Sequence, residues 1–210
     1  MSVVSAQLPE RPSLGQHLSE SIAEMRRNRV LSILIVVTAI IEIFGTSFST
    51  LLPELARLRL NLGIDGLGEF QAASAVGAFT AAALLTAWPV RGRRAYLYGI
   101  VIVALGAAVM LLGWAPDQMA VLIVLAAVAF AIAAWDILTQ SMMQLSVPDR
   151  LRGRAMGAWV FALGSAPLGH LQIGFLATSI GLDLALYANG MLVVATISIA
   201  LLLSRSLRRL

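Results

Sequence analysis

Two acidic side chains lie well inside long apolar segments of this sequence, away from the segment ends, Glu42 within residues 30–52 and Asp136 within residues 119–143. A charge near the centre of a bilayer costs at least about 2.5–3.5 kcal/mol, so such residues need protein or water around them. A carboxyl group in these surroundings can bind and release a proton, as in the proton relays of membrane proteins. Glu42 is the stronger candidate because it stands close to the middle of its segment. A purely structural hydrogen bond to a neighbouring helix is the alternative.

Asp136 begins a polar stripe that Gln140 and Gln144 continue at steps of four residues. Such steps keep side chains on one face of a helix. Asp136 lies about 10 Å from the end of its apolar segment, so solvation at a cavity mouth or pairing with a loop arginine is an alternative to a role in proton transfer. His170 is a further candidate, although a lone buried histidine is often satisfied by a backbone carbonyl.

Hydrolysis inside the membrane would need a serine and a histidine whose side chains meet. Ser165 and His170 share one apolar segment, but five residues along a helix turn the two side chains about 140° apart. The sequence has no cysteine, its other histidine is His17, and it contains no HExxH motif. We therefore expect neither an enzyme nor a bound cofactor or metal.

Six apolar runs must position these polar side chains, and each is close to the roughly 20 residues that a helix needs to cross a bilayer core. A chain that is 59% hydrophobic and 12% charged, with mean hydropathy +0.87, has too little polar surface for a soluble globule. The sequence thus predicts an all-α membrane protein. The runs are residues 30–52, 67–89, 95–114, 119–143, 155–178 and 184–204.

The basic residues, all of them arginines, are divided unequally between the two sides of these runs. Thirteen of the fifteen fall on one side, and Arg57 and Arg59 fall on the other. Cytoplasmic loops carry the excess of positive charge in membrane proteins. We therefore expect both termini in the cytoplasm and the chain in the inner membrane of a bacterial-type cell. Arginines in short loops fit anionic lipid headgroups as a partner, and not nucleic acid.

The chain divides into three parts on this basis. Residues 1–29 are a cytoplasmic lead-in, in which a capping box at Ser13 and apolar residues at helical spacing predict a short amphipathic helix. Residues 30–204 form the six-helix transmembrane bundle, and residues 205–210 a cytoplasmic tail.

Polarity varies along the six runs in a repeating order. The first and fourth runs carry Glu42 and Asp136, the second and fifth carry polar residues of intermediate number, and the third and sixth carry no charge. This order predicts a three-plus-three inverted repeat, in which the first helix of each triplet lines a cavity, the second flanks it and the third faces lipid.

Several motifs in a fixed order carry a resemblance to a known family. A loop of proline and basic residues precedes the fifth run, and a G-x-x-P-x-G-x-x-x-x-G pattern follows inside it. The loop residues are Pro148, Arg152, Gly153 and Arg154, and the pattern residues are Gly164, Pro167, Gly169 and Gly174. Further matches are Leu51-Leu52-Pro53-Glu54-Leu55-Ala56 and Gly66-Leu67-Gly68. Over most of residues 14–204 the sequence resembles the carboxy-terminal half of a major facilitator superfamily exporter, closest to the enterobactin-exporter-like and multidrug efflux branch.

The sequence also departs from that family's pattern. Pro89 and Leu85 stand where the loop signature G-x-x-x-D-x-x-G-R-R has its aspartate and first glycine, although Arg93 and Arg94 keep the arginine pair. His170 occupies a position inside the glycine and proline pattern where a small or apolar residue is expected. The family has twelve helices, and this chain has six.

The resemblance implies a half of a secondary transporter, with proton-coupled export of a small amphipathic molecule of the drug or siderophore class. A second six-helix bundle would complete it, either the missing amino-terminal half or a second copy of the chain. Glu42, Asp136, Gln140 and His170 would then line the pathway of protons and substrate, and the loop and glycine residues would serve conformational change. The alternative is a truncated or accessory membrane subunit that moves no substrate itself.

Overall fold

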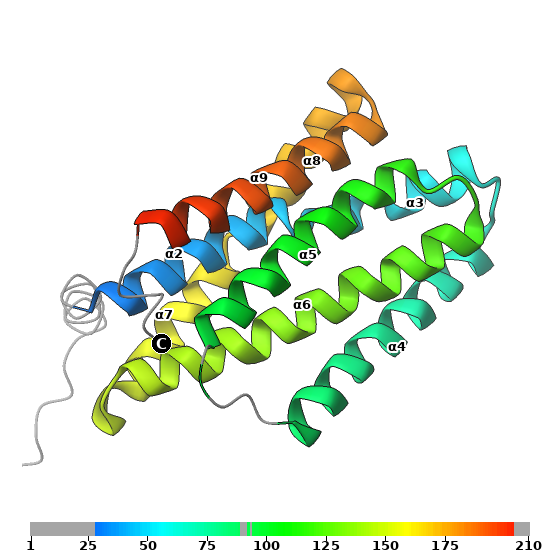
Figure 1. The fold of residues 1–210 in the computed structure, drawn as a ribbon. Coiled ribbons are helices and arrows are strands. Elements are labelled where there is room, and N and C mark those ends of the chain that lie inside the picture. Colours follow the sequence, from blue (N-terminus) through cyan, green and yellow to red (C-terminus); the bar gives the residue numbers. More distant parts are fainter. Residues whose placement is uncertain (1–27, 89–91, 93, 204–210) are drawn as a thin grey trace, which may run out of the picture.

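The computed structural model describes residues 28–88, 92 and 94–203, and these form a bundle of helices packed side by side (Figure 1). Six described segments are long and apolar enough to cross a membrane, as the hydropathy of the sequence predicts. They are Arg29–Arg59, Asp65–Ala87, Arg94–Trp114, Gln118–Ser146, Arg152–Ile180 and Leu182–Leu202. The amphipathic helix expected before residue 28 and the tail expected after residue 204 lie outside the described residues.

Four of the spans are single helices, which satisfy their backbone hydrogen bonds internally, as a chain in lipid must. These are α4 (Ile64–Ala87), α5 (Arg94–Trp114), α6 (Gln118–Ser146) and α9 (Leu182–Leu203). The first span is broken into α2 (Arg29–Phe44), the 3₁₀-helix η1 (Ser47–Leu51), the short α3 (Leu52–Glu54) and the π-helical η2 (Leu55–Arg59). The fifth comprises α7 (Arg152–Leu163) and α8 (Ala166–Ile180), after the 3₁₀ turn η3 (Asp149–Leu151).

The described chain begins and ends at the same end of the bundle (Figure 1). We name the end that carries Asn28, Arg94 and Arg152 the arginine end, and the end that carries Arg59 and Asp183 the opposite end. At the arginine end Asn28 caps α2 by accepting from the Leu31 N–H at 3.2 Å. Its Nδ2 also donates to the Ser146 carbonyl at 2.7 Å, which fastens the start of α2 to the end of α6.

Close approach of backbones at glycines holds three helix pairs together. A Cβ on Gly106 of α5 would lie 2.6 Å from the Gly190 carbonyl oxygen of α9. A Cβ on Gly77 of α4 would meet the Ala126 carbonyl of α6, and one on Gly169 of α8 would meet the Ile43 carbonyl of α2. Small residues at helix crossings are how membrane helices gain packing where lipid is as apolar as the side chains.

The third span differs from its expected place facing lipid. In α5, 56% of the most apolar stretch is buried inside the bundle, a larger share than in any other described span. The reason is that α5 lies between α6 and α9 and packs against both. By contrast, α4 and the α7–α8 span bury only 17% of their most apolar stretch and present wide apolar faces to the outside.

Candidate functional site

The first span breaks directly after the residue that the sequence singled out. Helix α2 ends at Phe44, and the N–H groups of Gly45 and Thr46 both donate to the Ile41 carbonyl, at 2.6 and 3.1 Å. Glycine has low helix propensity, and serine and threonine hydroxyls compete for backbone carbonyls, so residues 45–50 leave the regular α-helix. The prediction of one helix over 30–52 was therefore wrong in detail. Irregular backbone at membrane depth is tolerated where it faces protein or a cavity.

Glu42 lies in the last turn of α2 and is half-buried within this chain. The Thr46 hydroxyl lies 2.9 Å from the Glu42 carbonyl oxygen and 3.3 Å from its carboxylate Oε2. The break after α2 thus brings a hydroxyl donor onto the carboxylate. Thr38, one turn earlier, is fully buried and donates to the Leu34 carbonyl at 2.8 Å, so it offers no open polar surface.

Asp136 is half-buried on α6 and accepts a hydrogen bond from Gln140 Nε2 at 3.2 Å. Helix α6 continues to Ser146, three residues beyond the predicted end. Asp136 consequently lies ten residues, about 15 Å, from the end of its helix, deeper than the sequence suggested.

The two carboxylates stand on neighbouring helices. Glu42 lies on α2 and Asp136 on α6, and these two helices pack against each other. A charged carboxylate at membrane depth is costly unless protein or water surrounds it.

His170 meets a side chain and not the backbone carbonyl expected for a structural histidine. Its Nδ1 lies 2.7 Å from the Thr50 hydroxyl, which links α8 to η1, and both residues are exposed at the surface of this chain. Ser165, the residue considered with it for hydrolysis, donates to the Ala39 and Ala162 carbonyls at 3.2 and 2.7 Å instead.

A buried polar network that the sequence analysis did not single out lies beside these residues. Asn189 of α9 is fully buried, and its Nδ2 donates to the Ser47 hydroxyl at 3.0 Å. Gln172 of α8 donates to Asn189 Oδ1 at 3.2 Å. In the sequence, the sign of this network was a single asparagine, Asn189, inside the apolar sixth run. The network joins the broken segment of the first span to α8 and α9.

The glycine and proline pattern of the fifth span has two different roles. Gly164 and Pro167 flank the junction between α7 and α8, where proline stands in the first turn of the new helix. Gly169 allows α8 to reach the backbone of α2. A Cβ on Gly174 would meet no atom within 4 Å, so nothing in this chain packs on it.

The loop that precedes this span forms the turn η3 at the arginine end. Pro148 precedes the turn, and Asp149 pairs with Arg152 at 2.9 Å. A Cβ on Gly153 would meet no atom within 4 Å, and Arg154 is half-buried at the start of α7. These residues lie at the start of the fifth span, at the arginine end, whereas Glu42 lies in the last turn of α2. The loop motif is therefore separate from Glu42.

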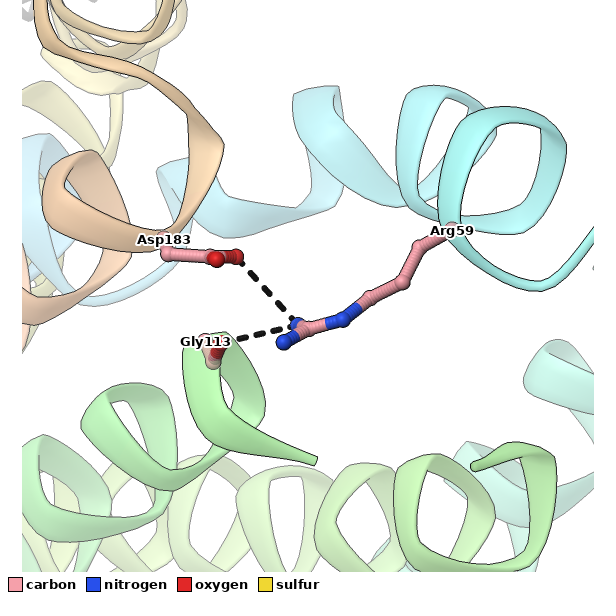
Figure 2. Close-up of polar contacts among 3 residues, drawn as sticks. All are labelled: Arg59, Gly113 and Asp183. Atoms are coloured by element: carbon pink, nitrogen blue, oxygen red, sulfur yellow. Dashed lines mark hydrogen bonds and ion pairs between the residues drawn. The ribbon is translucent and has the colours of Figure 1, made fainter. Parts of the chain in front are cut away.

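Arg59 fastens the opposite end of the bundle (Figure 2). Its Nη1 donates to the Gly113 carbonyl at 2.8 Å and lies 3.3 Å from Asp183 Oδ1. The Asp183 side chain is 58% exposed, so the ion pair contributes little and the bond to the carbonyl at the end of α5 matters more. This contact holds the π-helical end of the first span against α5 and α9.

Within the described residues, no group of three or more histidine, aspartate or glutamate side chains could hold a metal ion. A family model described as Major Facilitator Superfamily matches residues 3–170, well over half of the chain. The chain belongs to the major facilitator superfamily. Members of this superfamily are transporters and not enzymes. The partners of this chain are therefore a lipid bilayer and a small-molecule substrate. No curated protein and no solved structure matches the chain.

Proposed function

We propose that this major facilitator chain is one half of a secondary active transporter that exports a small amphipathic molecule in exchange for protons. Glu42 is the proton carrier in this proposal, and Asp136, Gln140 and His170 line the pathway. The chain lies in the inner membrane of a bacterial-type cell with both termini in the cytoplasm. A second six-helix bundle, from an amino-terminal half or another copy, closes the cavity.

The observation that carries the proposal is that Glu42 and Asp136 lie on two helices, α2 and α6, that pack against each other. Both carboxylates are only half-buried within this chain, so part of each must face something other than its own bundle. Lipid at that depth would cost several kcal/mol, whereas a water-filled cavity closed by a second bundle would not. Thr46 beside Glu42 supplies a hydroxyl that can hydrogen-bond the carboxylate in the charged state.

Four of the contacts between spans are consistent with a three-plus-three repeat, whereas the α8–α9 contact has no comparable α4–α5 counterpart. In such a repeat the first span corresponds to the fourth, the second to the fifth and the third to the sixth. The α4–α6 contact then corresponds to the contact between the α7–α8 span and α2. The same correspondence maps the α5–α6 contact onto the α2–α9 contact, and it leaves the α5–α9 and α2–α6 contacts in place. Inverted repeats of this kind place substrate and coupling-ion sites near the bilayer midplane.

Replacement of Glu42 tests the coupling. In the complete assembly, Glu42→Gln is expected to leave abundance in the membrane unchanged and to abolish proton-driven transport, because the amide cannot exchange a proton at this position. Glu54→Gln is the matched control, since Glu54 is an exposed carboxylate of the same span. Substrate efflux and proton flux in vesicles with an imposed pH gradient are the measurements. Transport by Glu42→Gln with unaltered pH dependence would remove Glu42 from the mechanism.

Cross-linking tests for the second bundle. The chain contains no cysteine, so a single cysteine at the exposed Ser49 can carry a photoactivatable thiol reagent. We expect a protein cross-link from this position, and from Thr46→Cys, in native membranes. A cysteine at Ile199, exposed on α9 away from the carboxylates, is the control and should label lipid. A monomeric chain that transports without any such cross-link contradicts the half-transporter proposal, and a monomeric inert chain supports the accessory or truncated alternative.

A further inference from the structure

An open cavity of about 440 Å³ lies at the arginine end of the bundle. It forms where the last three turns of α6 meet the first residues of α5 and α7. Its volume falls within the range of about 300–1,000 Å³ that is typical of small-molecule sites. The polar side chains that line it are Arg94, Gln140, Ser141, Gln144 and Arg152.

Hydrogen-bond donors dominate this lining. Arg94 and Arg152 line it from two different helices, and α6 adds two glutamines and a serine. No carboxylate lines the cavity. Two guanidinium groups with neutral donors between them suit a ligand group that has several acceptor oxygens and a negative charge.

One of the two arginines, Arg152, pairs with an acidic residue at the surface. Asp149 pairs with Arg152 at 2.9 Å, but its side chain is 89% exposed, so water screens the pair and a ligand can compete for the guanidinium at low cost. Asp136 accepts one hydrogen bond from Gln140 Nε2, and this amide carries a second N–H.

The position of the cavity indicates which anion it would meet. Arg94 is the first residue of α5 and Arg152 the first of α7, so both guanidinium groups lie where spans begin. Phosphate groups of lipids lie at this level of a membrane, and soluble phosphate compounds reach it from the aqueous side. A phosphate also offers more acceptor oxygens than a carboxylate to the donors that converge here.

We propose that this cavity binds a phosphate group, held between Arg94 and Arg152 with Gln144 and Ser141 as neutral donors. The topological role of these arginines, which needs only their charge, does not require them to share a cavity with polar residues of α6. A phosphate site uses their geometry as well as their charge.

Binding to the purified full chain in detergent tests the proposal, with two probes that separate the sources of phosphate. Short-chain phosphatidylglycerol represents a lipid headgroup and inorganic phosphate a soluble ligand. The Arg94→Gln/Arg152→Gln pair should weaken binding of the relevant probe about tenfold or more, because charge-assisted hydrogen bonds are lost. Arg57→Gln, which removes an exposed arginine at the opposite end, is the control and should change affinity less than about twofold.

Each outcome supports or contradicts the phosphate site. Loss of phosphatidylglycerol binding in the paired variant, with no effect of inorganic phosphate, identifies a lipid headgroup site, and the same dependence for inorganic phosphate identifies a soluble ligand. If neither probe binds, or if Arg57→Gln weakens binding as much as the pair does, the proposal is wrong. Should the arginine variants fail to insert, Gln144→Leu/Ser141→Ala keeps every charge and should still weaken binding a few-fold. Unchanged affinity in that variant would overturn the proposal.

Discussion

Asn189 illustrates how one polar residue can join three segments of this transporter. It is fully buried on α9, where it donates to Ser47 of η1 and accepts from Gln172 of α8. A buried amide has to find partners, because leaving it without them costs the full desolvation of the group. Its partners lie on the segment that follows the break in α2, so the network stabilises the irregular part of the first span.

Replacement of Asn189 measures the network. Asn189→Ala should lower stability by about 1–2 kcal/mol, since hydrogen bonds between membrane helices contribute about 0.6 kcal/mol on average and up to about 1.7. Thermal unfolding in detergent is the measurement. Ser198→Ala is the control, because Ser198 is exposed on the same helix and bonds only to its own turn, at the Val194 carbonyl. Equal shifts in the two variants would show that the network contributes nothing.

At the scale of elements, the crossing of α8 over α2 brings the fifth span to the carboxylate-bearing helix. Gly169 lies at the closest point, against the Ile43 carbonyl, one residue beyond Glu42. The position of the crossing therefore sets how near α8, with His170, lies to the break in α2. A side chain at residue 169 would push the two helices apart, since a backbone carbonyl cannot rotate away as a flexible side chain can.

Two glycines of the same pattern allow a matched test of this crossing. Gly169→Ala should destabilise the chain by about 1–3 kcal/mol, the usual cost of overpacking. Gly174→Ala, where an added Cβ meets nothing within 4 Å, should be neutral or stabilise by up to about 1 kcal/mol, because alanine has the higher helix propensity. Unfolding temperatures of the two purified variants distinguish the cases. Similar temperatures would contradict the close crossing.

At the scale of the whole molecule, charge divides the bundle along its axis. The cavity at the arginine end is lined by Arg94 and Arg152, whereas a second cavity of about 420 Å³ at the opposite end is lined by Glu69 and Asp117. Glu69 accepts a hydrogen bond from Gln118 there. This polarity runs in the direction that the positive-inside rule uses to orient membrane proteins.

Reporter fusions test the orientation that we propose from this polarity. Fusions at Gln118 and Asp183 are expected to report an external location, and fusions after Arg94, Arg154 and Leu210 a cytoplasmic one. A reporter that is active only outside the cytoplasm, paired with one that is active only inside, measures each site twice. Reversed activities at both external sites would overturn the orientation and would place the arginine cavity on the outside.

The sequence by itself determined the number of spans, the helical class and the two acidic positions. These features follow from local properties: about 20 apolar residues suffice to cross a bilayer, and a carboxylate within such a run is conspicuous whatever lies around it. The family resemblance depended on short motifs in order along the chain, and the superfamily assignment agrees with it. The finer assignments to efflux and to one half of a transporter stay predictions.

Only the tertiary structure decided which contacts these residues make. The packing of α2, which carries Glu42, against α6, which carries Asp136, joins residues far apart in sequence. The partners of Asn189 and the cavity shared by Arg94 and Arg152 do the same. Gly169 and Gly174 stand in one pattern, yet only Gly169 packs against another helix of this chain. The physical reason is that hydropathy specifies where a helix lies in the bilayer, whereas its rotation and its neighbours depend on packing and hydrogen bonds between helices.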